Sequence, residues 1–172
     1  MPRDSAGAVA TLVVRPAVPA DLDRMLEAWL ALTRYHFAFD PCYELRSDGE
    51  VEARALLRAQ LRDVNAAAWL ALRGPQLAGY CAVRVDRAPP IYRERMRAEI
   101  TDLWVQEGCR RQGVARRLVA EGFSWAGGQG AQRVEVRLSS SNAAGRAFWT
   151  ALEFGDFVEV LHRPLPSRSP LS

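Results

Sequence analysis

The sequence predicts an α/β (α+β) fold with one mixed sheet that is covered by helices on both faces. Helical and strand-like hydrophobic patterns follow one another in the order βααβββαβαβ. Short turns join neighbouring strands in the first half, as in hairpins, whereas helices join the strands in the second half, as in crossovers. The 172 residues suit one domain of ordinary size. We expect that domain at residues 9–165, with a disordered N-terminus at 1–8 and a flexible tail at 166–172.

The first half begins with a strand at residues 9–15, which Pro16 and Pro19 end. A helix is expected from about Asp21, because the apolar residues follow an i, i+3, i+4 spacing at Leu22, Met25, Leu26, Trp29, Leu30 and Thr33. A loop at 35–46 follows. Ser47 and Glu50 have the spacing of a capping box, which predicts a second helix to about Val64.

The later elements are assigned from alternation, β-branched residues and turn signals. Two strands are expected at 68–73 and 77–86, joined as a hairpin across Gly74-Pro75-Gln76. The remaining elements are strands at 97–105, 134–138 and 157–162 and helices at 114–126 and 143–152.

Composition excludes several kinds of chemistry. All 23 basic residues are arginine, so the lysine that a P-loop or a Schiff base requires is absent. The three cysteines lack any C-x-x-C spacing, and the two histidines are far apart in sequence, so we expect reduced thiols, a cytoplasmic location and no metal site. No stretch reaches the roughly 20 apolar residues of a membrane span, so no membrane partner is expected.

The most informative stretch is Arg110-Arg111-Gln112-Gly113-Val114-Ala115, which lies between a predicted strand and a predicted helix. At a helix N-terminus several backbone N–H groups lack partners and the macrodipole is positive, so a phosphate or diphosphate binds there readily. The small residues Gly113 and Ala115 allow close approach. Arg116 and Arg117 add positive charge. The alternative is a solvated, basic helix start.

This loop belongs to a longer pattern. It follows Leu103-Trp104-Val105 and precedes Arg117-Leu118-Val119, and a second group consists of Asn142, Phe148-Trp149 and Phe154. In this order and spacing the chain resembles the GNAT superfamily of acyl-CoA-dependent N-acyltransferases over about residues 11–165. The resemblance implies a mostly antiparallel sheet with a splayed parallel pair of strands, in whose cleft acetyl-CoA binds as co-substrate without a metal.

The resemblance also implies roles for particular residues. The main-chain N–H groups of Arg110, Arg111, Gln112, Gly113, Val114 and Ala115 would hold the diphosphate. The backbone of Leu103, Trp104 and Val105 would lie along the pantetheine arm and polarise the thioester carbonyl. In the second group, Asn142, Phe148 and Trp149 would complete the cofactor site.

The implied reaction is direct attack of a neutral amine on the thioester, with no acyl-enzyme. Such a reaction needs a base for the ammonium proton. Asp102 is preferred by resemblance, with Glu99 as the alternate; three residues apart, they would project to opposite faces of a regular strand. Either could instead be a surface or ion-paired carboxylate.

Two positions depart from the family pattern. Trp149 replaces a common tyrosine, and its indole is only a donor and too weak an acid to protonate a thiolate. Glu153 replaces the usual glycine before the aromatic residue, so we expect a differently built turn after the last helix.

The acceptor amine should bind at Tyr35, His36, Asp40, Tyr43 and Tyr92, although hydrogen-bonded packing roles remain open for His36 and Tyr43. A polyamine, an amino acid and a peptide N-terminus all fit this set, so the expected partner is a small-molecule or peptide amine. Exposed sheet edges in this architecture allow a homodimer.

Two rival functions remain. Trp149 and Glu153 are compatible with a regulatory module that binds acyl-CoA without turnover. The arginines at 110–117 and a sequence pI near 9.0 would suit a basic nucleic-acid-binding domain, which a steep salt dependence would reveal. No aromatic residues are interleaved with those arginines and no recognition motif is present, so we expect no nucleic-acid partner.

Overall fold

The structure, a computed structural model, describes residues 10–163. The expected disordered N-terminus at 1–8 and the expected tail at 166–172 both lie outside the described residues. The chain divides after Ser139 into two compact units, which are described separately below.

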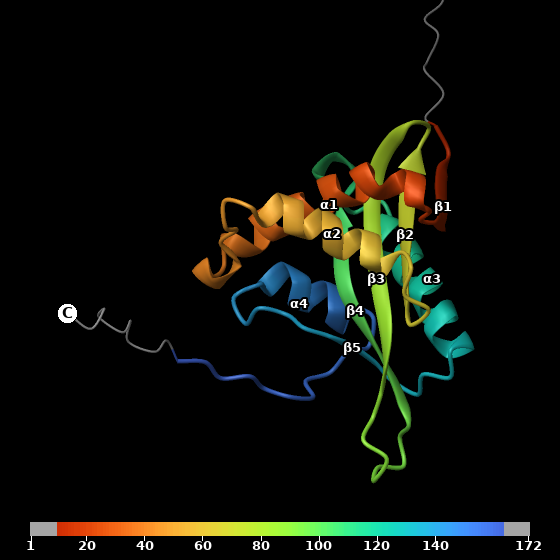
Figure 1. The fold of residues 1–172 in the computed structure, drawn as a ribbon, viewed down its shortest axis with the longest axis vertical. Coiled ribbons are helices and arrows are strands. Elements are labelled where there is room, and N and C mark those ends of the chain that lie inside the picture. The colour runs from red at the N-terminus through yellow and green to blue at the C-terminus, as the bar shows by residue number, and fades with distance from the viewer. Residues whose placement is uncertain (1–9, 164–172) are drawn as a thin grey trace, which may run out of the picture. The chain divides into compact units, whose positions relative to one another are not determined.

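The first unit contains a five-stranded sheet in the order β1-β2-β3-β4-β5 (Figure 1). The strands are β1 (Leu12–Pro16), β2 (Ala66–Arg73), β3 (Gln76–Arg87), β4 (Met96–Val105) and β5 (Val134–Val136). Every neighbouring pair is antiparallel except β4 and β5, which are parallel. The prediction of a mixed, mostly antiparallel sheet with one parallel pair is confirmed.

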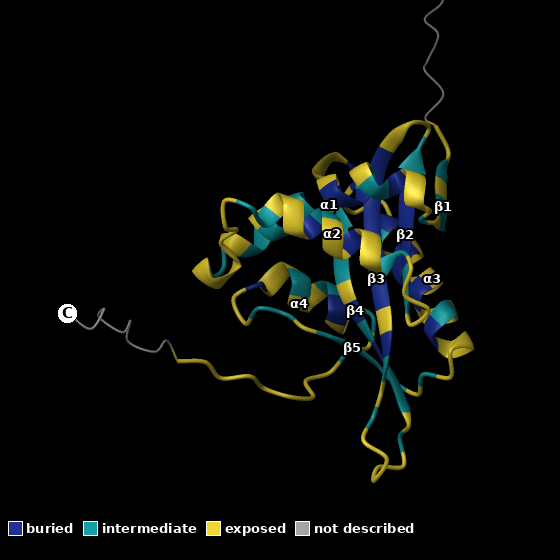
Figure 2. Cartoon of the chain, in the orientation of Figure 1, coloured by how far each residue is buried: buried dark blue, intermediate teal, exposed yellow. Residues whose placement is uncertain are grey.

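Helices cover both faces of this sheet, as predicted. The helices α1 (Leu22–Phe37) and α2 (Gly49–Gln60) lie in front of the sheet in Figure 1, and α3 (Val114–Gly128) lies behind it. Short 3-10 turns occupy Pro19–Asp21, Pro41–Tyr43 and Glu107–Cys109. The buried residues in Figure 2 concentrate on β2, β3 and the inner sides of these helices.

The core under α1 and α2 includes Leu77, Tyr80 and Ala82 of β3. Met25, Leu26 and Leu57 pack there against Tyr80 and Ala82. The Tyr80 ring is fully buried, and its hydroxyl lies 3.4 Å from Oε1 of Gln60 on α2. Burial raises the pKa of Tyr80 well above its usual range, so the phenol stays neutral.

The core under α3 depends on two glycines that allow close approach. A Cβ on Gly79 of β3 would lie 2.9 Å from Leu118 Cδ1, and one on Gly122 of α3 would lie 2.9 Å from Val83 Cγ2. The helix therefore packs directly on the backbone of β3. Its N-terminal end is held next to the end of β4.

The beginning of α1 is fixed by the buried carboxylate of Asp21. Arg15 donates two hydrogen bonds to it at 2.7 and 2.8 Å, and Val18 N–H donates a third at 3.0 Å. The hydrogen bonds from Arg15 are the main reason why the pKa of Asp21 falls to about 2. The predicted helix start near Asp21 is confirmed.

Two sequence predictions about the first unit are corrected. The Ser47–Glu50 capping box does not form, because α2 begins at Gly49 after Asp48, whose carboxylate pairs with Arg46 at 2.8 Å. The strand expected at 134–138 is shorter than predicted, because β5 has only the three residues Val134–Val136.

The second unit, described over residues 140–163, contains the helix α4 (Ala143–Thr150). The strand predicted at 157–162 is absent: these residues have no regular secondary structure, and Phe157, Val158, Val160 and Leu161 are exposed. A strand needs a partner for its backbone groups. Within residues 140–163 this unit provides none.

Candidate functional site

The parallel pair β4 and β5 separates partway along its length. The two strands are in register only at Ala98–Val134, Glu99–Glu135 and Ile100–Val136. Beyond Ile100, β4 continues to Val105 with β3 on one side and no strand partner on the other among the described residues. The backbone along this stretch of β4 is therefore an open edge.

A β-bulge at Thr101 determines which backbone groups face that edge. Ile100 is opposite Val83 and Asp102 is opposite Ala82, so Thr101 is the extra residue. Before the bulge Ala98 N–H bonds to Arg133 C=O on the β5 side, whereas after it Gln106 N–H bonds to Ala78 C=O near the start of β3. Because backbone direction alternates along a strand, Leu103 and Val105 direct their N–H and C=O groups to the open edge.

Trp104 is arranged differently from its neighbours. It lies opposite Tyr80, and its ring packs against the core under α1 and α2. Of the three strand residues expected beside the cofactor, Leu103 and Val105 therefore offer backbone groups to the open edge, and Trp104 supports the strand from behind.

The loop between β4 and α3 has an unusual backbone. Arg111 has φ 60° and Gly113 has φ 80°, both in the left-handed region. The first helical hydrogen bond of α3 runs from Arg117 N–H to Gly113 C=O. Among the described residues, the N–H groups at 111–116 have no backbone acceptor. A Cβ on Gly113 would meet nothing within 4 Å, so the space in front of these donors is open.

Side chains hold this loop from two sides. Arg110 donates from Nε to Val105 C=O at 3.2 Å, and its guanidinium carbon lies 5.7 Å from the ring centre of Tyr35 on α1. Gln112 accepts from Arg73 at 2.6 Å and donates to Gly108 C=O at 2.9 Å. The loop is thus joined to the ends of β2, β4 and α1.

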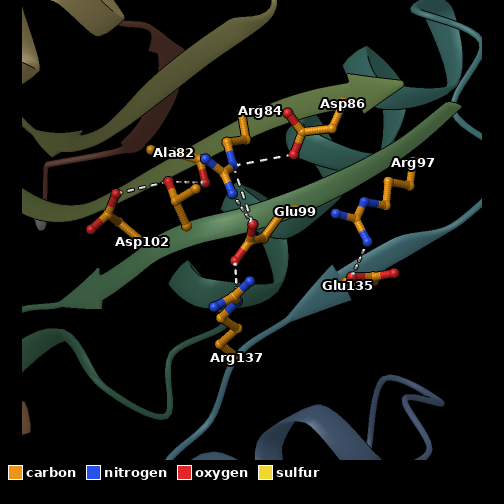
Figure 3. A network of polar contacts seen from close by, with 9 residues as sticks. Ala82, Arg84, Asp86, Arg97, Glu99, Asp102, Glu135 and Arg137 are labelled. Carbon is orange, nitrogen blue, oxygen red and sulfur yellow. Dashed lines mark hydrogen bonds and ion pairs between the residues drawn. The ribbon is translucent and has the colours of Figure 1, made fainter. Parts of the chain in front are cut away.

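The two candidate bases lie in different surroundings (Figure 3). Glu99 is held between two arginines, one on β3 and one just after β5, with Oε2 2.7 Å from Arg84 and Oε1 3.1 Å from Arg137. Its side chain is 14% exposed. Both of its oxygens are therefore engaged in ion pairs.

Asp102 has no ion pair in the described part of the chain. Its Oδ2 accepts a 2.9 Å hydrogen bond from the Thr101 hydroxyl. Burial raises the pKa of Asp102 to about 6, the nearby charge of Glu99 raises it further, and the hydrogen bond from Thr101 opposes both effects. A carboxyl with a pKa of about 6 is suited to accepting a proton near neutral pH.

β4 is not regular between these two carboxylates, so they do not point to opposite faces as they would on a regular strand. Glu99 lies opposite Arg84 and Asp102 lies opposite Ala82, and these β3 residues are two apart, so their side chains share one face. The bulge at Thr101 adds the residue that changes the alternation. Both carboxylates lie on the face that carries α1 and α2.

Four of the expected acceptor residues gather at the end of α1. Tyr35 and His36 are in its last turn, Tyr43 lies 5.2 Å from His36 between ring centres, and Asp40 accepts from Cys42 N–H at 2.8 Å. Burial lowers the pKa of His36, which favours the neutral ring at pH 7.

Tyr92 is not brought to this group. It lies in the turn that joins β3 to β4, at the Met96 end of β4, whereas Tyr35 contacts Arg110 just beyond the Val105 end. A strand of ten residues spans about 30 Å. The β3–β4 turn accordingly projects far from α1 in Figure 1.

The expected cofactor residues of the second unit support its own helix. Asn142 is buried and caps α4 by accepting from Gly145 N–H at 2.8 Å. The Trp149 ring lies 5.0 Å from both Phe148 and Phe154.

The turn after α4 is of the kind that glycine normally forms, which corrects the expectation for Glu153. Phe154 N–H bonds to Trp149 C=O and Glu153 N–H bonds to Thr150 C=O, the pattern of a Schellman motif. Glu153 occupies the left-handed position with φ 66°. The departure from the family pattern thus changes the residue and preserves the turn.

Two features of the site were not predicted. A phase change in the apolar residues, from Ala98 and Ile100 to Leu103 and Val105, is the signal that could have revealed the bulge at Thr101. No sequence signal identifies Arg73 as a support of Gln112, because the contact joins residues 39 positions apart.

Two other kinds of site are absent from the described part of the chain. Within residues 10–163, His, Cys, Asp and Glu side chains form no group of three or more that could hold a metal ion. No helix in the same range has the length and apolar character that crossing a membrane requires.

The family model of the acetyltransferase (GNAT) family matches residues 27–154. The chain therefore belongs to the GNAT family of acetyltransferases, as the resemblance in its motifs indicated. No curated protein sequence matches the chain.

Solved structures share the fold at low sequence identity. A mutant of the BH1408 protein from Bacillus halodurans aligns with a TM-score of 0.79 at 16% identity, over 90% of this chain and 99% of that one. The aminoglycoside N-acetyltransferase AAC(6')-Iy in complex with CoA aligns with a TM-score of 0.74 at 14% identity, over 94% and 99%. The aminoglycoside acetyltransferase meta-AAC0020 from an uncultured soil metagenomic sample, in complex with sisomicin, gives 0.67 at 18%, over 91% and 97%.

Proposed function

We propose that this GNAT acetyltransferase transfers an acetyl group from acetyl-CoA to a primary amine of a small molecule or peptide by direct attack. The observation that carries the proposal is the juxtaposition of the open β4 edge with the free N–H groups of the following loop. An extended chain with amide groups can pair with Leu103 and Val105, and a diphosphate can accept from residues 111–116. Acetyl-CoA has both parts.

The residues of the site fit this co-substrate in charge and in space. Gly113 has no Cβ, and the space that a Cβ would occupy has no other atom within 4 Å. Arg111 and Arg116 are exposed beside the N–H groups. When bound, acetyl-CoA supplies the thioester, and a backbone N–H of Leu103 or Val105 stabilises the negative charge that develops on its carbonyl oxygen.

The proton chemistry is assigned to Asp102. The amine nitrogen bonds to the acetyl carbon as the C–S bond breaks, and the nitrogen loses a proton to the Asp102 carboxylate. Glu99 is less suited to this role because two arginines engage both of its oxygens. Trp149 cannot protonate the departing thiolate, so we assign that proton to solvent.

The acceptor is proposed to bind on the face of the sheet that carries Asp102, next to the aromatic residues at the end of α1. The complex of meta-AAC0020 with sisomicin makes aminoglycosides a reasonable first choice among amines. The test is thiol release from acetyl-CoA with sisomicin, a polyamine, free amino acids and short peptides, with product masses as confirmation.

The outcomes separate the alternatives. Thiol release that depends on one class of amine supports the proposal and identifies the acceptor. Tight CoA binding without turnover of any amine would instead indicate the regulatory module that binds acyl-CoA. Failure to bind CoA would contradict both, and steeply salt-dependent retention on DNA would then favour the nucleic-acid alternative.

A further inference from the structure

We propose that Thr101, the extra residue of the β4 bulge, is a positioning residue whose hydroxyl orients the Asp102 carboxylate in both of its protonation states. The inference rests on the proposed function, in which Asp102 accepts the proton of the amine. Thr101 lies on β4 but outside the Leu103-Trp104-Val105 motif and the loop at 110–115. The bulge is what places this hydroxyl next to the carboxylate.

The proposal rests on two hydrogen-bond acceptors that lie close to the Thr101 hydroxyl. Thr101 Oγ1 lies 2.9 Å from Asp102 Oδ2 and 3.4 Å from Ala82 C=O across the strand pair (Figure 3). A hydroxyl has one hydrogen and two lone pairs, so it can donate to only one of these acceptors at a time. The ionised carboxylate is the stronger acceptor and the closer one.

The hydroxyl still has a partner after proton transfer. Once Oδ1 has taken the proton, Oδ2 is the carbonyl oxygen of the neutral acid and still accepts from the Thr101 hydroxyl, and Ala82 C=O offers that hydroxyl a second, competing acceptor. The carboxyl group then keeps a hydrogen bond before and after it takes the proton. Its Oδ1, which has no hydrogen-bond partner among the described residues, stays available to the amine.

The other groups around Asp102 cannot replace this hydroxyl. Glu99, on the same strand, carries a like charge that Arg84 and Arg137 partly neutralise. On β3, burial raises the pKa of both Tyr80 and Cys81, so both stay neutral. No ion pair in the described part of α1, α2 or α3 reaches Asp102, and the residues of β5 end opposite Ile100.

The test compares Thr101→Val, which keeps the shape and removes the hydroxyl, with Thr101→Ser, which keeps the hydroxyl. The pKa of Asp102 is followed by carbon-13 NMR of labelled aspartate in the free protein. In parallel, kcat/KM is measured against pH with acetyl-CoA and the fastest amine of the panel. Thr101→Val should raise the pKa of Asp102, because a hydrogen bond to the ionised form is lost.

The acidic limb of the pH profile should move to higher pH in Thr101→Val, with kcat/KM near pH 6 reduced about three- to tenfold, the equivalent of one hydrogen bond. KM for acetyl-CoA should stay unchanged, and Thr101→Ser should restore the wild-type profile. In an Asp102→Asn background, Thr101→Val should have no further effect on the rate.

Two results would overturn the inference: a wild-type pKa and profile in Thr101→Val, or a loss of activity that serine does not restore. If the valine variant fails to fold, Thr101→Ala provides the same comparison. Failure of the proposed function is distinguishable, because it would appear as absent acetylation in the wild-type protein. The NMR titration still tests the hydroxyl in that case.

Discussion

The two halves of β4, separated by the bulge at Thr101, are built in opposite ways. Before the bulge, residues 98–100 pair with strands on both sides, and Glu99 is neutralised by Arg84 and Arg137. After the bulge the strand has an open edge, and Asp102 has no ion pair in the described part of the chain. The first half has the features of a structural element, and the second leaves its polar groups available for chemistry.

This contrast shows why a carboxylate at the right strand is insufficient evidence for a catalytic role. Glu99 and Asp102 share a strand and a face of the sheet, and they differ in their neighbours. The two guanidiniums engage both oxygens of Glu99, which leaves neither oxygen available to a substrate. Burial without a counter-charge raises the pKa of Asp102 to about 6, which makes it a useful proton acceptor.

The largest expected effect is on turnover. Asp102→Asn should lower kcat at least about 100-fold, because an amide cannot accept the amine proton, and should leave CoA affinity unchanged. Glu99→Gln, the matched variant of the other half, should retain activity within a few-fold. Steady-state kinetics on both variants measures the difference, and a larger loss in Glu99→Gln would reverse the assignment.

The next largest effect concerns the loop at 110–115, which follows the second half of β4. Gly113→Ala puts a side chain in the left-handed region, which costs about 1–2 kcal/mol. The free loop should relax away from this conformation, and CoA must restore it to bind, so the affinity should fall about tenfold. Gly108→Ala is the control: its Cβ would also meet nothing within 4 Å, and its φ is ordinary. Calorimetry with CoA checks both variants. Equal affinities would place the diphosphate elsewhere.

The sequence predicts the loop before α3 better than it predicts the bulge in β4. The strand-loop-helix order and the motif around Gly113 are local, so they could be predicted, as could the parallel pairing of β4 with β5. The bulge at Thr101 depends on register with β3, which lies about twenty residues earlier in the chain. The prediction of a strand at 157–162 is wrong for a related reason. Alternation and β-propensity are properties of the segment itself, whereas a strand also requires a partner strand elsewhere in the chain.

A smaller effect is expected on the free energy of unfolding, and it should have opposite signs for Asp102→Asn and Glu99→Gln. The folded-state pKa of Asp102 is about 6 and the usual carboxyl value is about 4, so between these pH values the folded state binds more protons than the unfolded state. Stability contributed by this group is therefore full below pH 4 and is lost as the pH rises to 6.

Asp102→Asn removes this loss, so at pH 7 it should be more stable than the wild type by about 1 kcal/mol, with the gain vanishing near pH 4. Glu99→Gln should instead be less stable by about 1 kcal/mol, because two ion pairs are lost. Urea unfolding at several pH values measures both. An asparagine variant that is destabilised at pH 7 would contradict the burial of an uncompensated charge.

The smallest effect is expected from Arg137, whose side chain is 82% exposed. An ion pair of such a side chain contributes at most about 0.5 kcal/mol, so Arg137→Gln should leave stability almost unchanged. It also frees Oε1 of Glu99 and leaves that charge less neutralised, which should raise the pKa of Asp102 slightly and move the acidic limb of kcat/KM to higher pH. If Glu99 were the base, releasing it from Arg137 would instead change kcat itself. A pH profile of this single variant therefore distinguishes a carboxylate that acts on Asp102 from one that accepts the proton.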